Sequence, residues 1–389
     1  MYLPDFTFVT PPRVVVGWGA ATDERLAKEA GRLGKRPLVV AARSVRRSGA
    51  LEAMLVHLRE AGLTPTTHEN VPPEPTVDDL QDAMDAAREA DSVIAVGGGS
   101  ALDVGKGAAA LAGSGVTARD YFHGKAPVPE SAARAILAVP TTAGTGSEAT
   151  WVSVLVEPET ERKASIRGGA MMPAVTLLDA KMTVSCPASV TANSGMDAFV
   201  QAVEAYTSTG ANPLTDALAL DAAKLTGNAL EAAVGDPDDR MAREAMLLGS
   251  YMAGVALNTS RLGLVHGLAH PIGAITGAPH GLLCGLLMPP VMRFNQNAAL
   301  TKYVLLAEAL GLVEPGTHAR QATEAVERLI EFTEELLIRV GIPTRLSVLG
   351  LEESHLDRVA SDAMGSGSTK ANPRPVSEDD ARAVAAACL

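Results

Sequence analysis

The segment Ser92-Val-Ile-Ala-Val-Gly-Gly-Gly-Ser100 decides the fold of this chain, because an apolar strand runs directly into a glycine-rich turn. Residues 102–111 follow with the apolar spacing of a helix. Glycines let backbone amides approach a pyrophosphate, and the N-terminus of the next helix attracts it. The turn lacks the G-x-G-x-x-G pattern, so an ordinary tight turn is an equally good interpretation of this segment alone.

The same order of strand and helix repeats on both sides of this segment. Thr76 and Asp79 have the spacing of a capping box that opens one of the helices. Strands that alternate with helices in short units indicate a parallel, doubly wound sheet. The expected strands span residues 13–17, 37–41, 92–96 and 135–139, and an extended piece begins at residues 64–66 and runs toward residue 71. The expected helices span 23–33, 49–61, 76–90 and 102–111.

Beyond about Pro187 the periodicity becomes helical throughout, so we expect an all-α C-terminal domain. The domain boundary is placed at 183/184, which gives an α/β domain at 1–183 and a helical domain at 184–389. The expected helices of the second domain span residues 191–207, 213–234, 239–257, 297–310, 318–340 and 352–363.

Bulk composition limits the classes of function. The chain has 389 residues, of which 47% are hydrophobic and 20% charged, as in an ordered globular protein. A net charge of −12 argues against nucleic-acid binding, which depends on neutralising phosphates. Cys186, Cys284 and Cys388 form no C-x-x-C pair, which fits a reducing compartment. With no signal-peptide pattern and no apolar run of membrane-spanning length, we expect a cytoplasmic protein without a membrane partner.

A second glycine-rich loop, residues 140–148, follows the expected strand at 135–139. It contains Thr141, Thr142, Thr145 and Ser147. Ligands of open α/β sheets bind outside the carboxyl ends of the strands, where both loops should lie. Two such loops favour a dinucleotide.

Three histidines occur within residues 262–289, a segment that is otherwise apolar and rich in glycine. His266 and His270 are four residues apart and share a face if the segment is helical. Pro271 and Pro279 should limit how far a regular helix continues, which puts His280 where the chain can fold back. The histidines suit a transition metal or a proton relay, or they are core residues bonded to backbone carbonyls.

Asp197 and Gln201 place a carboxylate and an amide on one face of another apolar helix. Helix capping or a buried polar cluster would explain this pair on its own. Together with His266 and His280, the pair could form an oxygen and nitrogen shell for one divalent cation.

Over essentially its whole length, the chain resembles the iron-containing (group III) alcohol dehydrogenase family. The ordered set of motifs is more specific than any one loop, and it also includes Gly195-Met-Asp-Ala198 and Asn372-Pro-Arg374. The resemblance implies an NAD(P)-binding α/β domain followed by a helical domain that binds metal and substrate. By position it implies the metal ligands Asp197, His266 and His280, with Gln201 at the fourth ligand position, and His270 near the substrate. The cofactor residues it implies are Gly97, Gly98, Gly99, Ser100, Asp103, Thr141, Thr142, Thr145, Ser147 and Lys163.

The chain departs from the family pattern at two places. Gln201 stands where the family usually has histidine, and an amide oxygen is a harder and weaker donor than imidazole. We expect Fe²⁺, while Zn²⁺ or no bound metal stays open. After the strand at 37–41, the chain has Ala42 and Arg43 where many NAD-preferring relatives have an aspartate. Because guanidinium groups attract a 2′-phosphate, the cofactor choice leans to NADP, although a solvated helix start explains the arginines equally well.

The expected reaction is reversible hydride transfer between a nicotinamide and the carbonyl carbon of a small aldehyde or ketone, with His270 relaying the proton. Three alternatives remain. One is a metal-independent reductase of the maleylacetate reductase type, and another is a lyase of the dehydroquinate type. The third is a cofactor-binding protein that has lost catalysis. The family also implies a homo-oligomer, such as a dimer.

Overall fold

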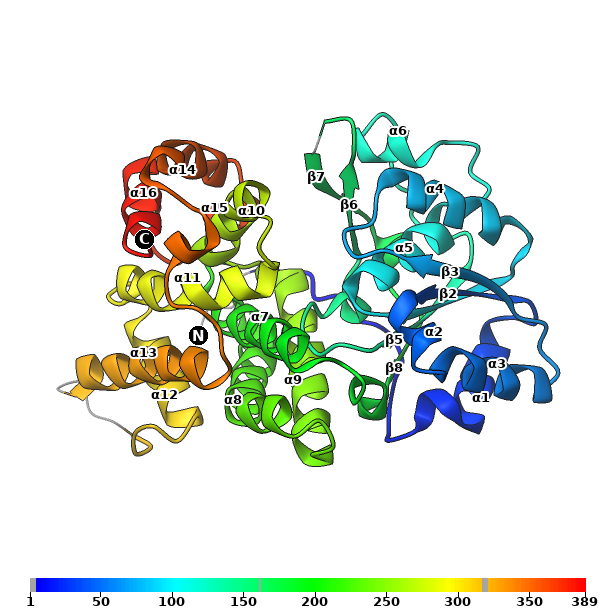
Figure 1. The fold of residues 1–389 in the computed structure, drawn as a ribbon, viewed down its shortest axis with the longest axis horizontal. Coiled ribbons are helices and arrows are strands. Elements are labelled where there is room, and N and C mark those ends of the chain that lie inside the picture. Colours follow the sequence, from blue (N-terminus) through cyan, green and yellow to red (C-terminus); the bar gives the residue numbers. More distant parts are fainter. Residues whose placement is uncertain (1–4, 161, 317–320) are drawn as a thin grey trace. The chain divides into compact units, whose positions relative to one another are not determined.

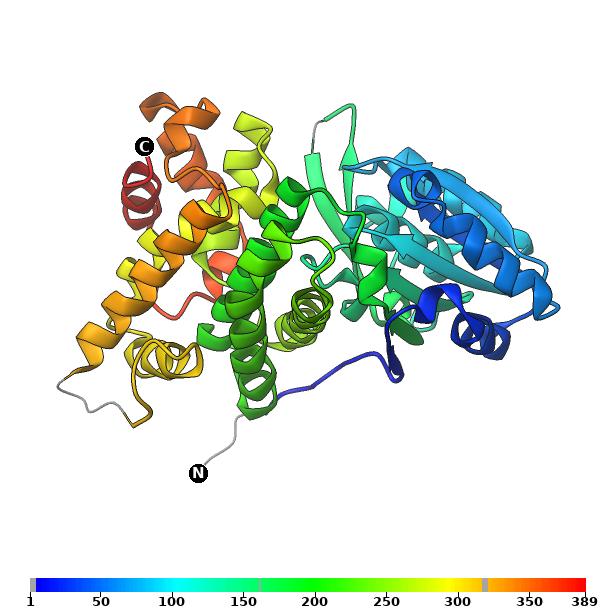
Figure 2. The same cartoon turned by 60° about the horizontal axis from the view of Figure 1, so that its bottom comes forward.

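A computed structural model describes residues 5–160, 162–316 and 321–389. The chain divides into two compact units. One unit is Thr10–Cys186, and the other combines Met1–Val9 with Pro187–Leu389. Figures 1 and 2 show the helices and strands of each unit. Within the described ranges, no helix has both the length and the apolar character needed to cross a membrane.

The first unit is built on a parallel six-stranded sheet. Its strand order is β1-β8-β5-β4-β2-β3, and every neighbouring pair runs parallel. The predicted fold class is therefore confirmed, although the strand at residues 175–178, the last of the sheet along the chain, was not predicted. The strands are β1 (Val14–Val16), β2 (Pro37–Ala42), β3 (Thr66–Val71), β4 (Ser92–Gly97), β5 (Ala135–Pro140) and β8 (Val175–Leu178).

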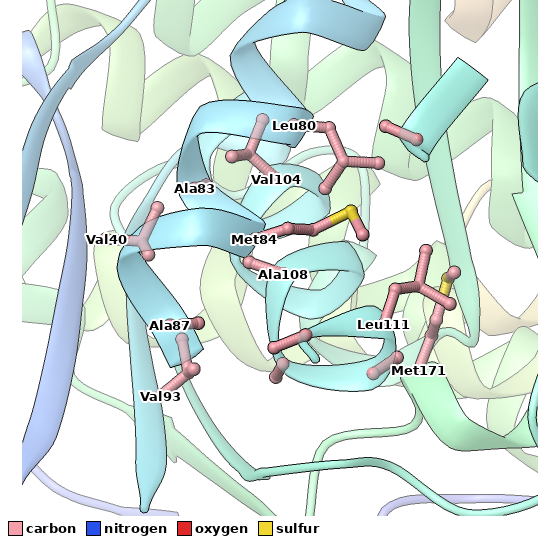
Figure 3. Packing of buried hydrophobic residues seen from close by; sticks show 14 of the residues in the cluster. Val40, Leu80, Ala83, Met84, Ala87, Val93, Val104, Ala108, Leu111 and Met171 are labelled. Carbon is pink, nitrogen blue, oxygen red and sulfur yellow. The ribbon is translucent and has the colours of Figure 1, made fainter. Parts of the chain in front are cut away.

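Alternate residues of the strands point to opposite faces, and helices cover both faces. Val40 and Val93 pack in one core with α4 (Val77–Ala86) and α5 (Gly99–Leu111), as Figure 3 shows. Val39 and Ile94, their chain neighbours, pack in the other core with α1 (Glu24–Leu33) and α3 (Ala50–Glu60). Burying both faces explains why the central strands are apolar at every position. The short helices α2 (Arg43–Arg47) and α6 (Ala118–Phe122) complete the unit.

A two-stranded antiparallel sheet was not predicted. It consists of β6 (Val152–Glu157) and β7 (Arg162–Arg167). Alternate residues of β6 are buried, and its backbone is bonded to Asp103 of α5. The charged residues at the start of β7 obscure the apolar alternation that would identify a strand from sequence.

The second unit is helical. Its helices are α7 (Ala188–Thr207), α8 (Pro213–Gly235), α9 (Arg240–Ser260), α10 (Leu264–Thr276), α11 (His280–Asn295), α12 (Leu300–Ala309), α13 (Ala322–Arg339), α14 (Leu356–Met364), α15 (Gly367–Lys370) and α16 (Glu378–Ala386). Helix α7 contacts α8, α9 and α11, which explains why all of its residues from Gly195 onward are buried. The helix predicted at 318–340 begins with residues that lie outside the described ranges, and α13 follows from Ala322.

The prediction that Pro271 limits the histidine helix was wrong. Helix α10 continues past Pro271 to Thr276 and ends at Gly277, which has a φ of 66°. Proline removes one backbone hydrogen bond but has the φ of a helix, so buried contacts can hold the helix together. Ile272, the next residue, is fully buried. The predicted reversal before His280 is present, because Pro279 precedes the first residue of α11.

Candidate functional site

Four side chains of the helical unit place potential metal-binding atoms within 4.8 Å of one another. Asp197 lies on α7, His266 on α10, and His280 and Cys284 lie one turn apart on α11. Nε2 of His266 is 3.4 Å from Oδ1 of Asp197, and Nε2 of His280 is 3.8 Å from the same oxygen. Sγ of Cys284 is 3.5 Å from Nε2 of His280. The structure thus brings together the three predicted ligands and adds a thiol.

Glycines allow these helices to approach one another closely. A Cβ atom added to Gly281 would lie 2.0 Å from the carbonyl oxygen of Asn193 on α7. A Cβ atom added to Gly267 would lie 2.0 Å from Oγ1 of Thr369 on α15. Only glycine fits at such contacts, since real Cβ atoms do not approach so near. The residue after His280 therefore determines how near α11 comes to Asp197.

Glu204 fixes the orientation of His266. Its Oε2 is 2.6 Å from Nδ1 of His266, and its Oε1 accepts a 2.7 Å hydrogen bond from the backbone N–H of Val265. With Nδ1 directed at this carboxylate, Nε2 points to the cluster, as second-shell carboxylates arrange metal-binding imidazoles. The prediction from sequence gave Glu204 no role. Its position seven residues after Asp197, on the same face of an apolar helix, was the available signal.

Asn372 supports the beginning of α10. Its Oδ1 accepts a hydrogen bond from the backbone N–H of Leu264 at 3.1 Å. Asn372 and Asn295 also exchange two amide hydrogen bonds, at 2.7 and 2.9 Å. Arg374 stacks on the ring of Phe294, 3.9 Å from its centroid. The Asn-Pro-Arg motif therefore makes structural contacts in the helical unit.

Three buried atoms beside the cluster have no hydrogen-bond partner within the described part of the chain. They are Oδ1 of Asp197, Oε1 of Gln201 and Nε2 of His266. Each of these residues is at most 5% exposed, and Nε2 of Gln201 donates to Oδ2 of Asp197 at 3.1 Å. Buried polar atoms rarely lack partners, because their desolvation is costly. Unpartnered oxygen and nitrogen atoms beside a second imidazole and a thiol fit a divalent transition metal.

The protonation of the cluster reflects its burial and its mutual charges. Burial acts to raise the pKa of Asp197, but interactions with His266 and His280 outweigh it and lower that pKa. Burial acts to lower the pKa of His266, while contacts with Cys284, Asp197 and Glu204 hold that pKa well above its usual range. Burial raises the pKa of the Cys284 thiol to about 12. A cation that binds here meets an already ionised Asp197, but it must displace protons from His266 and Cys284.

His270 lies at the solvent side of the cluster. It is exposed, and its ring stacks on that of His280 with centroids 4.9 Å apart and an interplanar angle of 21°. Its position, one turn after His266 on α10, is the one predicted from the spacing.

In the α/β unit, the two glycine-rich loops lie side by side. Strands β4 and β5 pair up to Gly97 and Pro140, and the N–H of Thr141 donates to the carbonyl oxygen of Gly97 at 2.9 Å. A Cβ atom added to Gly99 would lie 2.8 Å from Cγ2 of Thr145, and one added to Gly98 would lie 3.3 Å from Oγ1 of Thr142. The predicted glycines and threonines therefore converge at one edge of the sheet.

The N-terminus of α5 is open to an anion. It has no side-chain cap and no acidic residue in its first turn. Helix α4 differs, since it has a capping box at Thr76 and the acidic residues Asp78 and Asp79. Uncapped N–H groups and the helix dipole make such a terminus a site for phosphate. Gly97 has a φ of 150°, which favours glycine over residues with side chains.

The open terminus lies at the topological switch point of the sheet. Strands β2 and β4 are neighbours, but the chain continues from β2 to β3 on one side and from β4 to β5 on the other. Helix α3, after β2, packs in one core, and α5, after β4, packs in the other. Ligands of doubly wound sheets bind at this point. A Cβ atom added to Gly97 would lie 2.8 Å from Cβ of Ala42, where exposed Arg43 follows.

Other predicted cofactor residues make contacts within the unit. Asp103 is buried and accepts hydrogen bonds from the hydroxyl of Ser147 and the N–H of Val154. It also pairs with Lys106, whose Nζ donates to the carbonyl oxygen of Ser147 at 2.9 Å. Lys163 on β7 pairs with Glu74 at 2.7 Å. Asp103 and Lys106 of α5 thus hold the second loop against that helix through Ser147.

Family models cover nearly the whole chain. Residues 11–180 match iron-containing alcohol dehydrogenase, and residues 191–389 match the C-terminal part of the Fe-containing alcohol dehydrogenase family. Because both units match this family, the protein is an oxidoreductase that acts on CH–OH groups. The chain belongs to the iron-containing alcohol dehydrogenase family, which confirms the resemblance predicted from its motifs.

Individual relatives cover almost all of the chain. It is 34% identical to the NAD-dependent methanol dehydrogenase of Bacillus methanolicus, over 96% of this chain and 97% of that one. It is 31% identical to the NADPH-dependent butanol dehydrogenase of Clostridium saccharobutylicum, over 97% and 96% of the two chains. A crystal structure of 1,3-propanediol oxidoreductase has a TM-score of 0.92 and 33% identity, over 99% of this chain and 100% of that one.

Proposed function

We propose that this alcohol dehydrogenase uses NAD(P) and a divalent cation to interconvert a small alcohol and its aldehyde or ketone. The observation that carries the proposal is a buried oxygen of Asp197 and a buried nitrogen of His266 that lack hydrogen-bond partners, directly beside His280. A structural cluster would satisfy these atoms internally, whereas a metal site leaves them ready to coordinate. The relatives support the reaction class, because the names of several describe them as alcohol dehydrogenases.

The residues of the helical unit have distinct roles in this proposal. Asp197, His266 and His280 hold the cation, and Gln201 orients the Asp197 carboxylate through its amide N–H. A bound divalent cation supplies Lewis acidity toward a carbonyl oxygen. The imidazole of His270 exchanges the alcohol proton with solvent, since it is exposed and stacked on His280. A His270→Asn variant that keeps the wild-type pH profile would exclude this role.

The residues of the α/β unit would bind the dinucleotide. Gly98, Gly99 and Ser100 present the uncapped N-terminus of α5 to the pyrophosphate, while Thr141, Thr142 and Thr145 line the adjacent loop. Asp103, Ser147 and Lys106 hold that loop in place. Lys163 remains a proposed contributor, with Glu74 as its present partner. The nicotinamide accepts or supplies the hydride.

A finer proposal concerns the choice of cofactor, which leans to NADP. Arg43 follows β2 at the switch point, and Glu69 on the neighbouring strand is paired with Arg46. A guanidinium at this place favours a 2′-phosphate, and no carboxylate stands at position 42 or 43 to bind ribose hydroxyls. In Arg43→Ala, we expect KM for NADPH to rise about 10- to 100-fold, as for the loss of a charged hydrogen bond, with little change for NADH. An equal rise in KM for NADPH and NADH would contradict the proposed preference for NADP.

The proposed function is tested on the purified protein with metal analysis and a panel of small aldehydes. We expect one bound divalent cation per chain and oxidation of NADPH or NADH that depends on it. Loss of a residue that hydrogen-bonds a metal ligand typically weakens metal affinity roughly 10- to 100-fold. Asp197→Ala removes a proposed ligand itself, so it should weaken metal binding at least as much. Asp216→Ala is a matched control, because this carboxylate pairs with Lys302 in the same unit.

Other outcomes would identify the alternatives. Reduction of a maleylacetate-type substrate without metal would indicate the metal-independent reductase. Product formation without a net change in cofactor would indicate the lyase. Dinucleotide binding without turnover would indicate a protein that has lost catalysis. The proposal further includes a cytoplasmic location and a homo-oligomer, which fractionation and light scattering would test.

A further inference from the structure

Cys284 belongs to the donor cluster although its thiol has no place in the function proposed above. We infer that Cys284 is the fourth protein ligand of the cation, and that the site consequently prefers zinc to ferrous iron. This inference rests on the proposed function only in assuming that a divalent cation occupies the cluster. It concerns the identity of the ligands and of the metal, which can differ while the reaction stays the same.

The geometry places the sulfur among the donors. Cys284 is fully buried and lies one helical turn after His280 on α11, so both side chains face α7 from the same side of their helix. Its Sγ lies within 4.8 Å of the donor atoms of Asp197, His266 and His280, and the sulfur is 3.5 Å from Nε2 of His280. A cation bound to all four atoms by bonds of about 2.0–2.3 Å would hold them about 3.3–3.8 Å apart. The separations of 3.4, 3.8 and 3.5 Å within the cluster are close to this range.

The unpartnered atoms provide a second, independent observation. Oδ1 of Asp197 and Nε2 of His266 are buried and have no hydrogen-bond partner among the described residues, although they lie 3.4 Å apart. The thiol of Cys284 belongs to the same group of donor atoms, all within 4.8 Å of one another. The thiol therefore lies beside an oxygen and a nitrogen that contact each other as an ion pair but make no hydrogen bond, which distinguishes Cys284 from a packed core cysteine such as Cys388.

Gln201 is less suited to the fourth position. Its amide N–H is bonded to Asp197, and an amide oxygen is a weak donor for a transition metal. A thiolate is softer and binds zinc strongly, and zinc exceeds ferrous iron in general affinity for nitrogen and sulfur donors. Cys284 on α11 is therefore better suited than Gln201 to supply the fourth donor.

The charge at the site follows from these ligands. When the cation binds, the thiol proton passes to solvent and an S–metal bond forms, with no change in oxidation state. The anionic groups of Asp197 and Cys284 then balance a dication. With four protein ligands, a bound zinc ion would have to become five-coordinate to take up the substrate oxygen, as zinc does in some catalytic sites.

Cobalt(II) substitution of the full-length protein tests the ligand directly. We expect a sulfur-to-cobalt charge-transfer band in the near ultraviolet for the wild type. The band should disappear in Cys284→Ser and persist in Cys388→Ser, the matched control, whose thiol is also buried but donates to the carbonyl oxygen of Val384. X-ray absorption on the zinc form needs no variant and should show one sulfur at about 2.3 Å.

Metal preference is tested by anaerobic competition between Zn²⁺ and Fe²⁺, read by elemental analysis. The wild type should select zinc, and Cys284→Ser should lose about tenfold or more of this selectivity. A cobalt protein without the sulfur band, or a zinc protein without a sulfur neighbour, would overturn the inference even if reductase activity is present. Protein that binds no metal would overturn the inference together with the metal-dependent function. Reductase activity with metal and sulfur both confirmed would support both proposals.

Discussion

His266 lies between two buried carboxylates, Asp197 on one side and Glu204 on the other. This arrangement gives each nitrogen of one imidazole a separate task. Nδ1 is held by Glu204 at 2.6 Å, so that Nε2 is available to the donor cluster. A residue without an acceptor at position 204, such as alanine, would remove this restraint on the ring, although no proposed metal ligand would have changed.

Glu148 makes the stability of the protein depend on pH. It is almost completely buried, and burial raises its pKa to about 7, despite the opposing charge of Lys106. Between its ordinary value of 4.5 and about 7, the folded protein keeps a proton that the unfolded chain releases. The free energy of unfolding therefore falls as pH rises through this interval, by at most about 3 kcal/mol. Glu148→Gln should remove this fall.

Urea unfolding followed by tryptophan fluorescence measures this effect, because both tryptophans, Trp18 and Trp151, lie in the α/β unit with Glu148. Wild type and variant should be similar near about pH 5, and the variant should be the more stable near about pH 8. Glu157→Gln is the matched control of opposite sign. The pKa of Glu157 is lowered, chiefly by the hydrogen bond from Thr160, so its loss should destabilise the unit at neutral pH. An unchanged pH slope in Glu148→Gln would contradict the prediction.

Single residues also show what could be predicted from the sequence about the candidate site. Asp197, His266 and His280 could be named because motif spacing marks them, and the structure brings these residues together. Cys284 and Glu204 were not identified. A cysteine and a glutamate in apolar helices have no distinctive spacing, and their importance comes from α7, α10 and α11 packing together. That packing is tertiary information.

At the scale of elements, the contact between α7 and α11 determines the spacing of the donors. A Cβ atom at Gly281 would overlap the carbonyl oxygen of Asn193, so Gly281→Ala must push α11 away from α7. We expect a loss of about 1–3 kcal/mol in stability, as for other overpacked sites, together with weaker metal binding. Thermal unfolding and calorimetric metal titration would measure the two effects.

Gly235→Ala provides the control for this change. Gly235 is the last residue of α8, and an added Cβ atom would have no neighbour within 4 Å. We expect wild-type metal affinity in this variant. If Gly281→Ala also bound metal with wild-type affinity, the helix contact would have no influence on the site.

Elements were predicted well where local signals were strong. Apart from Ser92, the strands at 37–41, 92–96 and 135–139 are apolar because both faces of the sheet are covered, and the Thr76 capping box is present. The continuation of α10 past Pro271 was missed, since sequence rules weigh proline's local cost but not the burial that offsets it. Strands β6 and β7 were missed because their pairing joins a polar strand to a half-buried one.

At the scale of the whole molecule, the two candidate sites lie in different units. The donor cluster is within Pro187–Leu389, and the glycine loops are within Thr10–Cys186. A ligand protects most strongly the segments that it binds, because it stabilises their closed state. In hydrogen exchange, zinc alone should protect residues 195–204 and 264–285 most strongly. NADPH alone should protect residues 97–102 and 141–147 most strongly. Zinc protection confined to the α/β unit would contradict this division.

The hydrogen bond from Leu264 to Asn372 joins residues 108 positions apart. During synthesis, the histidine segment therefore leaves the ribosome long before the residue that supports its first turn. The α/β unit has its whole sequence available by then and can fold early. Helix α10 cannot make its hydrogen bond to Asn372 until that residue has been synthesised. During that interval, the nascent chain exposes apolar, histidine-containing surface that a chaperone would recognise.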